Sequence, residues 1–500
     1  MASPDKQCEL DPIPTSLLKK CLQPLIPTIT NIVNLSLASG SFPDIFKKSI
    51  ITSLLKKSTL DKEQLSNYRP ISNLSFLSKL TERIVKARLD AHLSTNSLYN
   101  KFQSAYTKLH STETALLSLH DHFIRAISQQ KVTCLCLLDL SAAFDTIDHT
   151  ILLNRLQSSF GIQGTALQWF QSYLSSRSFS VLANGTKSPP LPVTCGVPQG
   201  SVLGPLLFII YTTPLSSLLS ASSANHHLYA DDTQLFISFT PQSFVSTIQS
   251  LQNTIAAVAN WMSANLLCLN QSKSEFMVIG LPKQLSKINQ PSLAMPDNTI
   301  LISVDSARNL GIIFDSHLTL SKHVSALTSS CFYHIRDLKR VRNCLSAETA
   351  TLIATSLIHT KLDYCNSLFL NLPSCLINRL QLIQNAAARA VSRTKQSDHI
   401  TPILKSFHWL RIRERILFKI ASLSYNALQF RRPSYIHDLL TIQKSNRTRS
   451  SDVITLERPV NPSRLKFTDR SFYIFKLLSF GTSYQAHFAS TPTLDLHTIL

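Results

Sequence analysis

The sequence has 500 residues and 44% hydrophobic content, which is enough for two or three domains with sizeable cores. The start has no apolar segment of a secretory signal, and no run approaches the roughly 18 apolar residues of a membrane span. The formal net charge is +20, and residues 331–450 hold 19 Lys and Arg against 6 Asp and Glu. We therefore expect an intracellular protein of the nucleus or cytoplasm, neither secreted nor embedded in a membrane, whose basic block binds a polyanion or forms solvated helix faces.

Residues 1–37 contain five prolines and one short apolar-periodic run, which predicts a lead-in segment with a single helix near 29–37. A strand is predicted over 50–57 and a helix over 74–89. Between them, Pro70 forces an extended or turn conformation on Arg69. Arg69 and the lysines that end the strand are candidates for binding a triphosphate, although each alone also fits an ordinary surface charge.

A nearly continuous apolar and β-prone run covers residues 132–140, and this pattern predicts a strand buried on both faces. A capping box beginning at Ser111 predicts a helix before it, to about residue 128. Asp139 lies at the end of the strand, where a charge is costly unless it is paired or bound to metal. Asp148 is the predicted N-cap of the next helix, and Asp145 in the intervening turn is predicted to be structural.

Glycine is scarce in this chain, yet three of its ten glycines fall within nine residues, at Gly196, Gly200 and Gly204. Such clustering predicts backbone with positive φ or a close approach of the backbone to a ligand. An apolar run after Pro205 predicts a helix. A plain junction between a loop and a helix would need only one glycine, so the pattern favours a binding loop.

Asp231 and Asp232 stand between two apolar, β-prone runs, which predicts a tight hairpin with both acids at its apex. A turn selected only for folding would favour Asn-Gly or Asp-Gly. Adjacent carboxylates repel each other unless a cation neutralises them, and hard oxygen ligands of this kind suit Mg²⁺. A solvated Asp-Asp turn is the alternative interpretation for an isolated pair.

The order of these features suggests one catalytic centre. Asp139 and the hairpin aspartates are far apart in sequence, so only a sheet with their strands adjacent could gather three carboxylates for two metal ions about 4 Å apart. This arrangement serves in-line phosphoryl transfer. Residues 132–240 contain three basic residues and five aspartates, followed later by the basic block, which suits a metal-dependent site that acts on a polyanion.

At this point the chain resembles the reverse transcriptase of a non-LTR, LINE-type retrotransposon over nearly its whole length. Six stretches carry the resemblance in the family's order: Asn-Tyr-Arg-Pro-Ile-Ser at 67–72, Leu-Asp-Leu-Ser-Ala-Ala-Phe-Asp at 138–145, Gly-Val-Pro-Gln-Gly-Ser-Val-Leu-Gly-Pro at 196–205, Tyr-Ala-Asp-Asp at 229–232, Leu-Asn-Gln-Ser-Lys-Ser-Glu at 269–275, and Asn-Leu-Gly-Ile-Ile-Phe at 309–314. The tetrapeptide alone is modest evidence, whereas six ordered motifs are specific.

The resemblance implies the catalytic roles. Asp139, Asp231 and Asp232 would be the metal ligands, with the Leu140 carbonyl assisting, and the cofactor would be two Mg²⁺ ions, with Mn²⁺ as a substitute. Lys273 would protonate the pyrophosphate that leaves.

The resemblance also implies how the nucleotide is held. Phe144 would stack under the sugar of the incoming nucleotide and exclude a 2′-hydroxyl, with ordinary core packing as the alternative. Gln199 and Gly200 would line the nucleotide and the template, and Arg69 would contact the triphosphate.

The implied fold class is α+β: a right-hand polymerase with fingers, a palm with an antiparallel sheet, a helical thumb and a basic helical C-terminal region. The expected domains are a lead-in segment (1–37), fingers and palm (38–316), thumb (317–400) and basic region (401–500). In the basic region, charge and a stacking surface for nucleic acid would come from Trp409, Arg411, Arg413, Arg415 and Lys419, although a solvated basic helix face is the alternative.

The expected function is RNA-directed DNA polymerisation, with an RNA template, a DNA primer and dNTPs as partners. Complete relatives carry an endonuclease domain upstream, and this chain begins at what would be the following linker. We therefore expect no DNA-nicking activity, and a separate endonuclease is a further candidate partner. Residues 469–500 resemble the family's ending only loosely. The alternatives are an inactive remnant that binds RNA, an RNA-templated RNA polymerase, or a two-metal nuclease.

Overall fold

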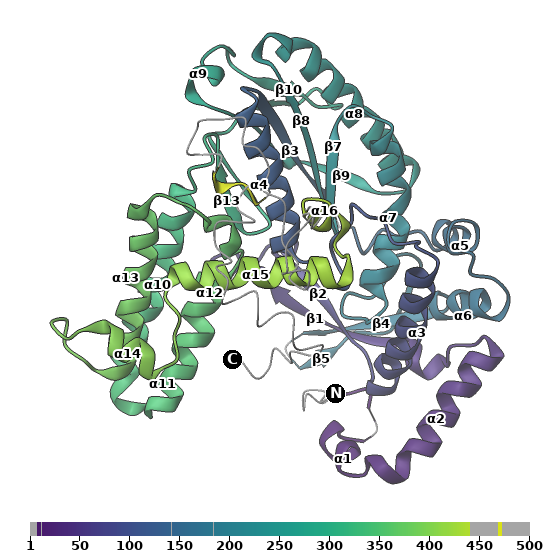
Figure 1. Cartoon of the computed structure of the whole chain (residues 1–500). Coiled ribbons are helices and arrows are strands. Elements are labelled where there is room, and N and C mark those ends of the chain that lie inside the picture. Colours follow the sequence, from purple (N-terminus) through teal and green to yellow (C-terminus); the bar gives the residue numbers. More distant parts are fainter. Residues whose placement is uncertain (1–7, 12, 142, 184, 441–468, 473–500) are drawn as a thin grey trace, which may run out of the picture. The chain divides into compact units, whose positions relative to one another are not determined.

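The computed structural model describes residues 8–11, 13–141, 143–183, 185–440 and 469–472 (Figure 1). The chain forms two compact units, and each unit combines separate stretches of sequence. The first comprises Met1–Tyr106, Leu138–Thr233 and Asn253–Lys273, and the second comprises Thr107–Leu137, Gln234–Gln252 and Ser274–Leu500. Helices and mainly antiparallel sheets occur together, so the predicted α+β class is confirmed. The predictions for 1–7 and for most of the divergent C-terminus lie outside the described residues.

The first unit begins with two helices, α1 (Thr15–Lys20) and α2 (Leu22–Ser39), where the sequence predicted one. Pro24 does not prevent the longer helix because it lies in the first turn of α2, where backbone N–H groups have no partner within the helix. Pro27 lies inside α2. The proline-based prediction of a short helix near 29–37 was therefore wrong in its extent.

A five-stranded sheet follows in the first unit, with strand order β2-β1-β4-β5 and β6 paired with β4. β1 (Lys48–Leu55) is antiparallel to β2 (Tyr68–Asn73) and parallel to β4 (Arg177–Ala183). β5 (Thr186–Lys187) and β6 (Leu191–Val193) are short. Two 3₁₀ turns, η1 (Asp44–Lys47) and η2 (Leu65–Asn67), flank β1.

Four further helices lie in this unit: α3 (Phe76–Thr95), α5 (His149–Ser158), α6 (Gly164–Leu174) and α7 (Gly204–Ser220). The Asp148 carboxylate accepts a hydrogen bond of 2.8 Å from the Ile151 N–H, so the predicted N-cap of α5 is confirmed. α7 is buried along most of its length, which agrees with the apolar run predicted to be a helix after the glycine loop.

A four-stranded sheet has the order β7-β8-β3-β9. Its strands are β3 (Val132–Ser141), β7 (Asn225–Tyr229), β8 (Asp232–Phe239) and β9 (Cys268–Ile279). β3 is the predicted buried strand, and Val132, Cys134 and Leu135 are fully buried in it. The strand ends that carry Asp139, Asp232 and Lys273 all belong to the first unit. η3 (Pro241–Ser243) and α8 (Phe244–Ala264) follow β8.

The second unit contains α4 (Thr112–Ser128), whose predicted capping box is confirmed: Ser111 and Thr114 exchange side-chain and backbone hydrogen bonds. Two small antiparallel hairpins follow. Their strands are β10 (Ser292–Ala294) with β11 (Ile300–Ile302), and β12 (Ser306–Asn309) with β13 (Ile312–Asp315), preceded by α9 (Pro282–Leu285).

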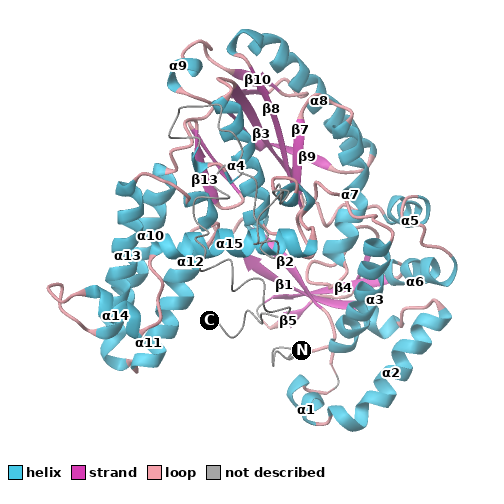
Figure 2. Ribbon diagram, in the orientation of Figure 1, coloured by secondary structure: helices cyan, strands magenta, loops and turns pink. Residues whose placement is uncertain are grey.

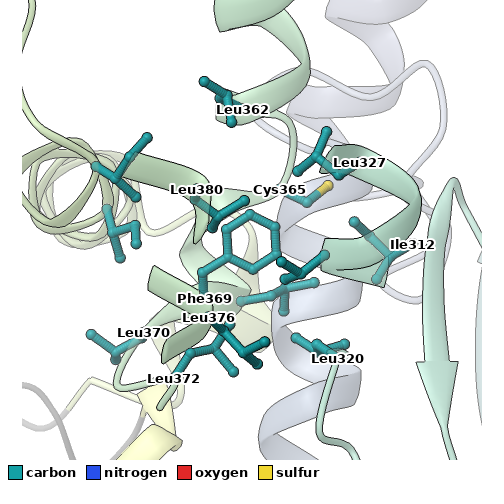
Figure 3. Packing of buried hydrophobic residues seen from close by; sticks show 14 of the residues in the cluster. Ile312, Leu320, Leu327, Leu362, Cys365, Phe369, Leu370, Leu372, Leu376 and Leu380 are labelled. Atoms are coloured by element: carbon teal, nitrogen blue, oxygen red, sulfur yellow. The ribbon is translucent and has the colours of Figure 1, made fainter. Parts of the chain in front are cut away.

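Among the described residues of the second unit, those after β13 are mainly helical (Figure 2). The elements are α10 (Ser321–Val341), η4 (Arg342–Cys344), α11 (Ala347–Ala354), a π-helical turn η5 (Thr355–His359), α12 (Thr360–Asp363), η6 (Asn366–Phe369), α13 (Ser374–Ser392), α14 (Ile400–Ser406), α15 (Ile412–Phe430) and α16 (Ser434–His437). α10 and α13 pack along each other. Figure 3 shows the buried Phe369 ring among leucines of these helices, including Leu376 and Leu380.

Candidate active site

Asp139 lies near the end of β3, one position before the buried Leu140. The apolar residues that precede Asp139 keep the strand buried, while the aspartate side chain remains 25% exposed. The Lys273 ammonium on β9 lies 3.2 Å from Oδ2 of Asp139. The fold therefore brings together two predicted site residues that are 134 positions apart, and the lysine neutralises the aspartate.

The aspartate turn joins β7 to β8. Ala230 adopts a left-handed conformation with φ of 56°, and Asp232 is already the first residue of β8. The prediction of a hairpin is confirmed, but the apex consists of Ala230 and Asp231, not of both acids. An alternating pattern of residues indicates that a strand is present, but it does not determine the residue at which the strand begins. Asp232 was therefore predicted to lie in the turn, although it is the first residue of β8.

The surroundings of the turn raise the pKa of both its carboxyl groups. Burial, more than any other cause, raises the pKa of Asp231, and the nearby Asp139 charge raises it further, while Arg69 and Lys273 oppose the shift. Burial raises the pKa of Asp232 to about 6, with the charges of Asp231 and Asp139 adding to the effect. The three aspartates are therefore electrostatically coupled, as the sequence led us to expect.

These aspartates suit a divalent ion as ligands. In the part of the chain that the structure describes, no three His, Cys, Asp or Glu side chains are gathered closely enough to hold an ion by themselves. Mg²⁺ does not need such a cage, since it usually keeps water ligands and binds one or two carboxylates together with substrate phosphates. The half-buried, mutually repelling carboxyls of Asp231 and Asp232 have the hard oxygen atoms that such an ion prefers.

The glycine loop requires its glycines. At Gly196, with φ of 81°, an added Cβ would lie 2.7 Å from the Asp145 carbonyl oxygen. At Gly200, with φ of 115°, it would lie 2.8 Å from the Ser72 carbonyl oxygen. Both positions combine a left-handed or extended positive φ with close backbone contact, which only glycine tolerates without strain. The prediction of positive φ is confirmed at both positions, whereas close approach of this backbone to a ligand remains a prediction.

Gln199 is held from two sides. The side-chain amide of Gln199 donates to both carboxylate oxygens of Asp145, at 3.0 and 2.9 Å. The backbone carbonyl oxygen of Gln199 accepts a hydrogen bond from the Ser72 N–H of β2 at 2.8 Å. Asp145 therefore has the structural role that the sequence predicted, because it holds the side chain of Gln199. Gln199 is in turn a candidate nucleotide-binding residue.

Phe144 is half-buried, and its ring stacks on the fully buried Phe208 of α7 with ring centroids 4.8 Å apart. The Phe144 carbonyl accepts a hydrogen bond of 2.9 Å from the Val197 N–H of the glycine loop. This hydrogen bond holds the backbone of Phe144 against the glycine loop, and the stacking on Phe208 covers one face of the Phe144 ring.

Glu82 on α3 is a residue that the sequence analysis missed. It has no solvent exposure, and its Oε2 accepts from the N–H groups of Val202 and Leu203, at 2.6 and 3.0 Å, where the glycine loop enters α7. Ser78 donates to its other oxygen at 3.3 Å. The sequence could have indicated only that Glu82 lies on the same face of α3 as residues predicted to be buried. Its hydrogen-bond partners are identified by the fold alone.

Arg69 is exposed on β2, opposite Leu54 of β1, and its charge acts on Asp231. Lys56 is also exposed, and its ammonium donates to the Ser66 carbonyl at 2.7 Å. Arg69 is a basic residue predicted to bind the triphosphate, and its positive charge lowers the pKa of Asp231 in the aspartate turn.

The predicted stacking role of Trp409 is wrong for this conformation. Its side chain is only 9% exposed and packs in the core of the second unit against His359 and Phe407. Arg415 forms a two-point ion pair with Asp363, so its charge is already partnered. The prediction failed because Trp409 is followed by basic residues in the sequence, whereas in the fold its side chain packs among apolar and aromatic residues.

The remaining basic residues of α15 and its N-cap differ in how far their charges are exposed or paired. Lys419 pairs with Glu113 at 3.3 Å. The side chains of Arg411 and Arg413 are exposed and donate to the hydroxyls of Thr401 and Ser374 respectively. The Arg411 backbone N–H also donates to the Glu414 carboxylate at 2.9 Å. Two of the five predicted nucleic-acid contacts, Arg411 and Arg413, therefore present exposed charge.

Residues 55–314, more than half of the chain, match the reverse transcriptase (RNA-dependent DNA polymerase) family. The chain belongs to the reverse transcriptase family. Its resemblance to non-LTR retrotransposon enzymes is confirmed by relatives that are named as RNA-directed DNA polymerases of transposable elements. One is the probable RNA-directed DNA polymerase from transposon BS of Drosophila melanogaster, 28% identical over 72% of this chain and 40% of the relative. Another is the RNA-directed DNA polymerase from mobile element jockey of Drosophila funebris, 27% identical over 72% and 39%.

Among solved structures, an apo telomerase from Candida tropicalis is 13% identical, with a TM-score of 0.43, over 79% of this chain and 66% of that chain. The chain spans about two fifths of the length of the curated relatives just named. Reverse transcriptases generally use divalent metal ions and act on an RNA template with a primer. None of the helices in the described ranges is sufficiently long and apolar to cross a lipid bilayer.

Proposed function

We propose that this reverse transcriptase chain is an active RNA-directed DNA polymerase of a LINE-type element, which adds dNTPs to a DNA primer 3′-hydroxyl on an RNA template. The coupled Asp139, Asp231 and Asp232 carboxylates support this proposal most directly. They would hold two Mg²⁺ ions, or Mn²⁺ as a substitute, with help from the Leu140 carbonyl. Bound ions would supply Lewis-acid activation of the hydroxyl and charge stabilisation of the leaving pyrophosphate.

The chain's own side chains would orient the nucleotide. Arg69 would contact the triphosphate, because its positive charge already acts on the aspartate turn. Gln199, fixed by Asp145, would line the nucleotide together with the exposed Gly200 backbone. Lys273 would release Asp139 and donate a proton to pyrophosphate, which its exposed ammonium could reach. Phe144 would contact the sugar.

The assignment of fingers and palm to 38–316, a thumb to 317–400 and a basic region to 401–500 remains part of this proposal. So does a nuclear or cytoplasmic location. A separate endonuclease would be one source of the primer, since the relatives extend well beyond the matched region.

The deciding experiment is primer extension on a defined RNA template with Mg²⁺. We expect DNA products that require dNTPs and an annealed primer. Products made only from ribonucleotides would indicate an RNA polymerase, and shortening of the template would indicate a nuclease. RNA binding without any product would identify an inactive remnant.

Binding of template RNA should depend on Arg411 and Arg413, the exposed arginines at the N-cap and in the first turn of α15. Replacing both by glutamine is expected to flatten the log-log dependence of affinity on salt by about 1.4, since each phosphate contact on a single strand contributes about 0.7. The measurement is a series of Kd values for a single-stranded RNA between low and moderate salt. Arg415 is left intact because its replacement by glutamine would leave the carboxylate of Asp363 without this positively charged partner.

The matched control replaces Lys283 and Lys287, two exposed lysines of the second unit, by glutamine. This variant loses the same charge away from α15, and its salt dependence should equal that of the unmodified chain. An equal decrease in both variants would mean that net charge, not these arginines, sets the affinity.

A further inference from the structure

Residues 102–105 lie along β7, the strand that leads into the aspartate turn. The Leu228 N–H donates to the Phe102 carbonyl at 2.8 Å, and the Ser104 N–H donates to the Leu228 carbonyl at 3.0 Å. These two bonds place Gln103 opposite Leu228 in a parallel bridge. The segment thus acts as a short additional strand beside β7, within the first unit.

The Gln103 side chain is buried at this bridge, with an exposed fraction of 2%. Its Oε1 accepts from the N–H of Ala230 at 3.0 Å and from that of Ala105 at 2.9 Å. Its Nε2 lies 3.5 Å from the Ala230 carbonyl. One carboxamide therefore contacts both polar backbone groups of Ala230.

Ala230 needs such support because its φ of 56° is unfavourable for a residue with a Cβ. Backbone in this region persists only where the surroundings determine it strongly. The residue immediately precedes Asp231, so a change of its dihedral angles would redirect both turn carboxylates.

We propose that Gln103 is a positioning residue for the catalytic turn: it fixes the Ala230 backbone and so sets the directions in which Asp231 and Asp232 offer their carboxylates to divalent cations. This inference deepens the proposed function and rests on it for its catalytic meaning. Replacing a group that orients metal ligands typically lowers metal affinity by about 10- to 100-fold.

The test is the variant Gln103→Met, which has a side chain of similar length and volume but no acceptor for the two N–H groups. Binding of Mn²⁺, measured from the electron paramagnetic resonance signal of the free ion without nucleic acid, should weaken by about 10-fold or more. In primer extension, kcat should fall by a similar factor with little change in the KM for dNTP.

Two further variants separate positioning from general destabilisation. Gln103→Glu keeps an acceptor for both N–H groups but loses the Nε2 donor that faces the Ala230 carbonyl, and it should bind Mn²⁺ more tightly than Gln103→Met. Gln384→Met removes an equally buried glutamine, which donates to the Leu410 carbonyl in the second unit, and should leave Mn²⁺ binding unchanged. Unchanged Mn²⁺ binding in Gln103→Met, or equal losses in all three variants, would overturn the proposal.

The two hypotheses can fail separately. If the unmodified chain extends no primer, the proposed function fails, while the Mn²⁺ measurement still decides the role of Gln103. If the unmodified chain extends primers and Gln103→Met does so with the same kcat and the same Mn²⁺ affinity, only the positioning role is refuted.

Discussion

Replacing Asp231 by asparagine is expected to reduce primer extension by about 10³-fold or more, because a neutral amide cannot replace a carboxylate ligand where charge develops in the transition state. Folding should be retained. Burial and Asp139 already disfavour the charged form of Asp231 and raise its pKa, so loss of the charge relieves repulsion in the folded state. The measurements are kcat/KM for single-nucleotide addition and the thermal unfolding midpoint.

An exposed aspartate of the same unit supplies the control. Asp61→Asn makes the same chemical change in the loop after β1, where the carboxylate contacts the Glu63 N–H at 3.0 Å. Its primer extension should remain near that of the unmodified chain. If Asp231→Asn retained normal rates, or if it lost activity only because it had unfolded, the assignment of Asp231 as a metal ligand would be refuted.

Local features of the fold could be predicted from the sequence. The continuous apolar run before Asp139 forms β3, because a strand buried on both faces needs apolar side chains on both. The caps at Ser111 and Asp148 act within three residues, so their partners are encoded nearby. The glycines at 196 and 200 indicated positive φ, but not that their close neighbours are the backbone of Asp145 and of Ser72.

Partners distant in sequence could not be predicted. Gln103 contacts Ala230 across 127 positions, and Glu82 contacts Val202 across 120 positions. Neither residue breaks a local pattern in a way that identifies its partner. The errors have the same origin: Arg415 looked available because Asp363, 52 positions away, was not known to face it. Charge content predicts a basic region, whereas tertiary packing decides which charges remain exposed.

Phe144→Ala is expected to weaken the preference for deoxynucleotides over ribonucleotides. The Phe144 ring is half-buried and rests on Phe208, with ring centroids 4.8 Å apart, so it cannot easily move away from an added 2′-hydroxyl. An apolar ring offers this hydroxyl no hydrogen bond and would remove its water. An unmatched polar group costs about 1 to 3 kcal/mol, or roughly 5- to 150-fold, and steric overlap adds to this.

The measurement is kcat/KM for dGTP and GTP on one RNA template. The dGTP/GTP ratio should fall by about 5- to 150-fold or more in Phe144→Ala, mainly through better use of GTP. Phe144→Tyr keeps a ring on Phe208 and should retain most of the preference, which makes it the matched control. If alanine lowered both rates together and left the ratio unchanged, Phe144 would serve core packing and another residue would select the sugar.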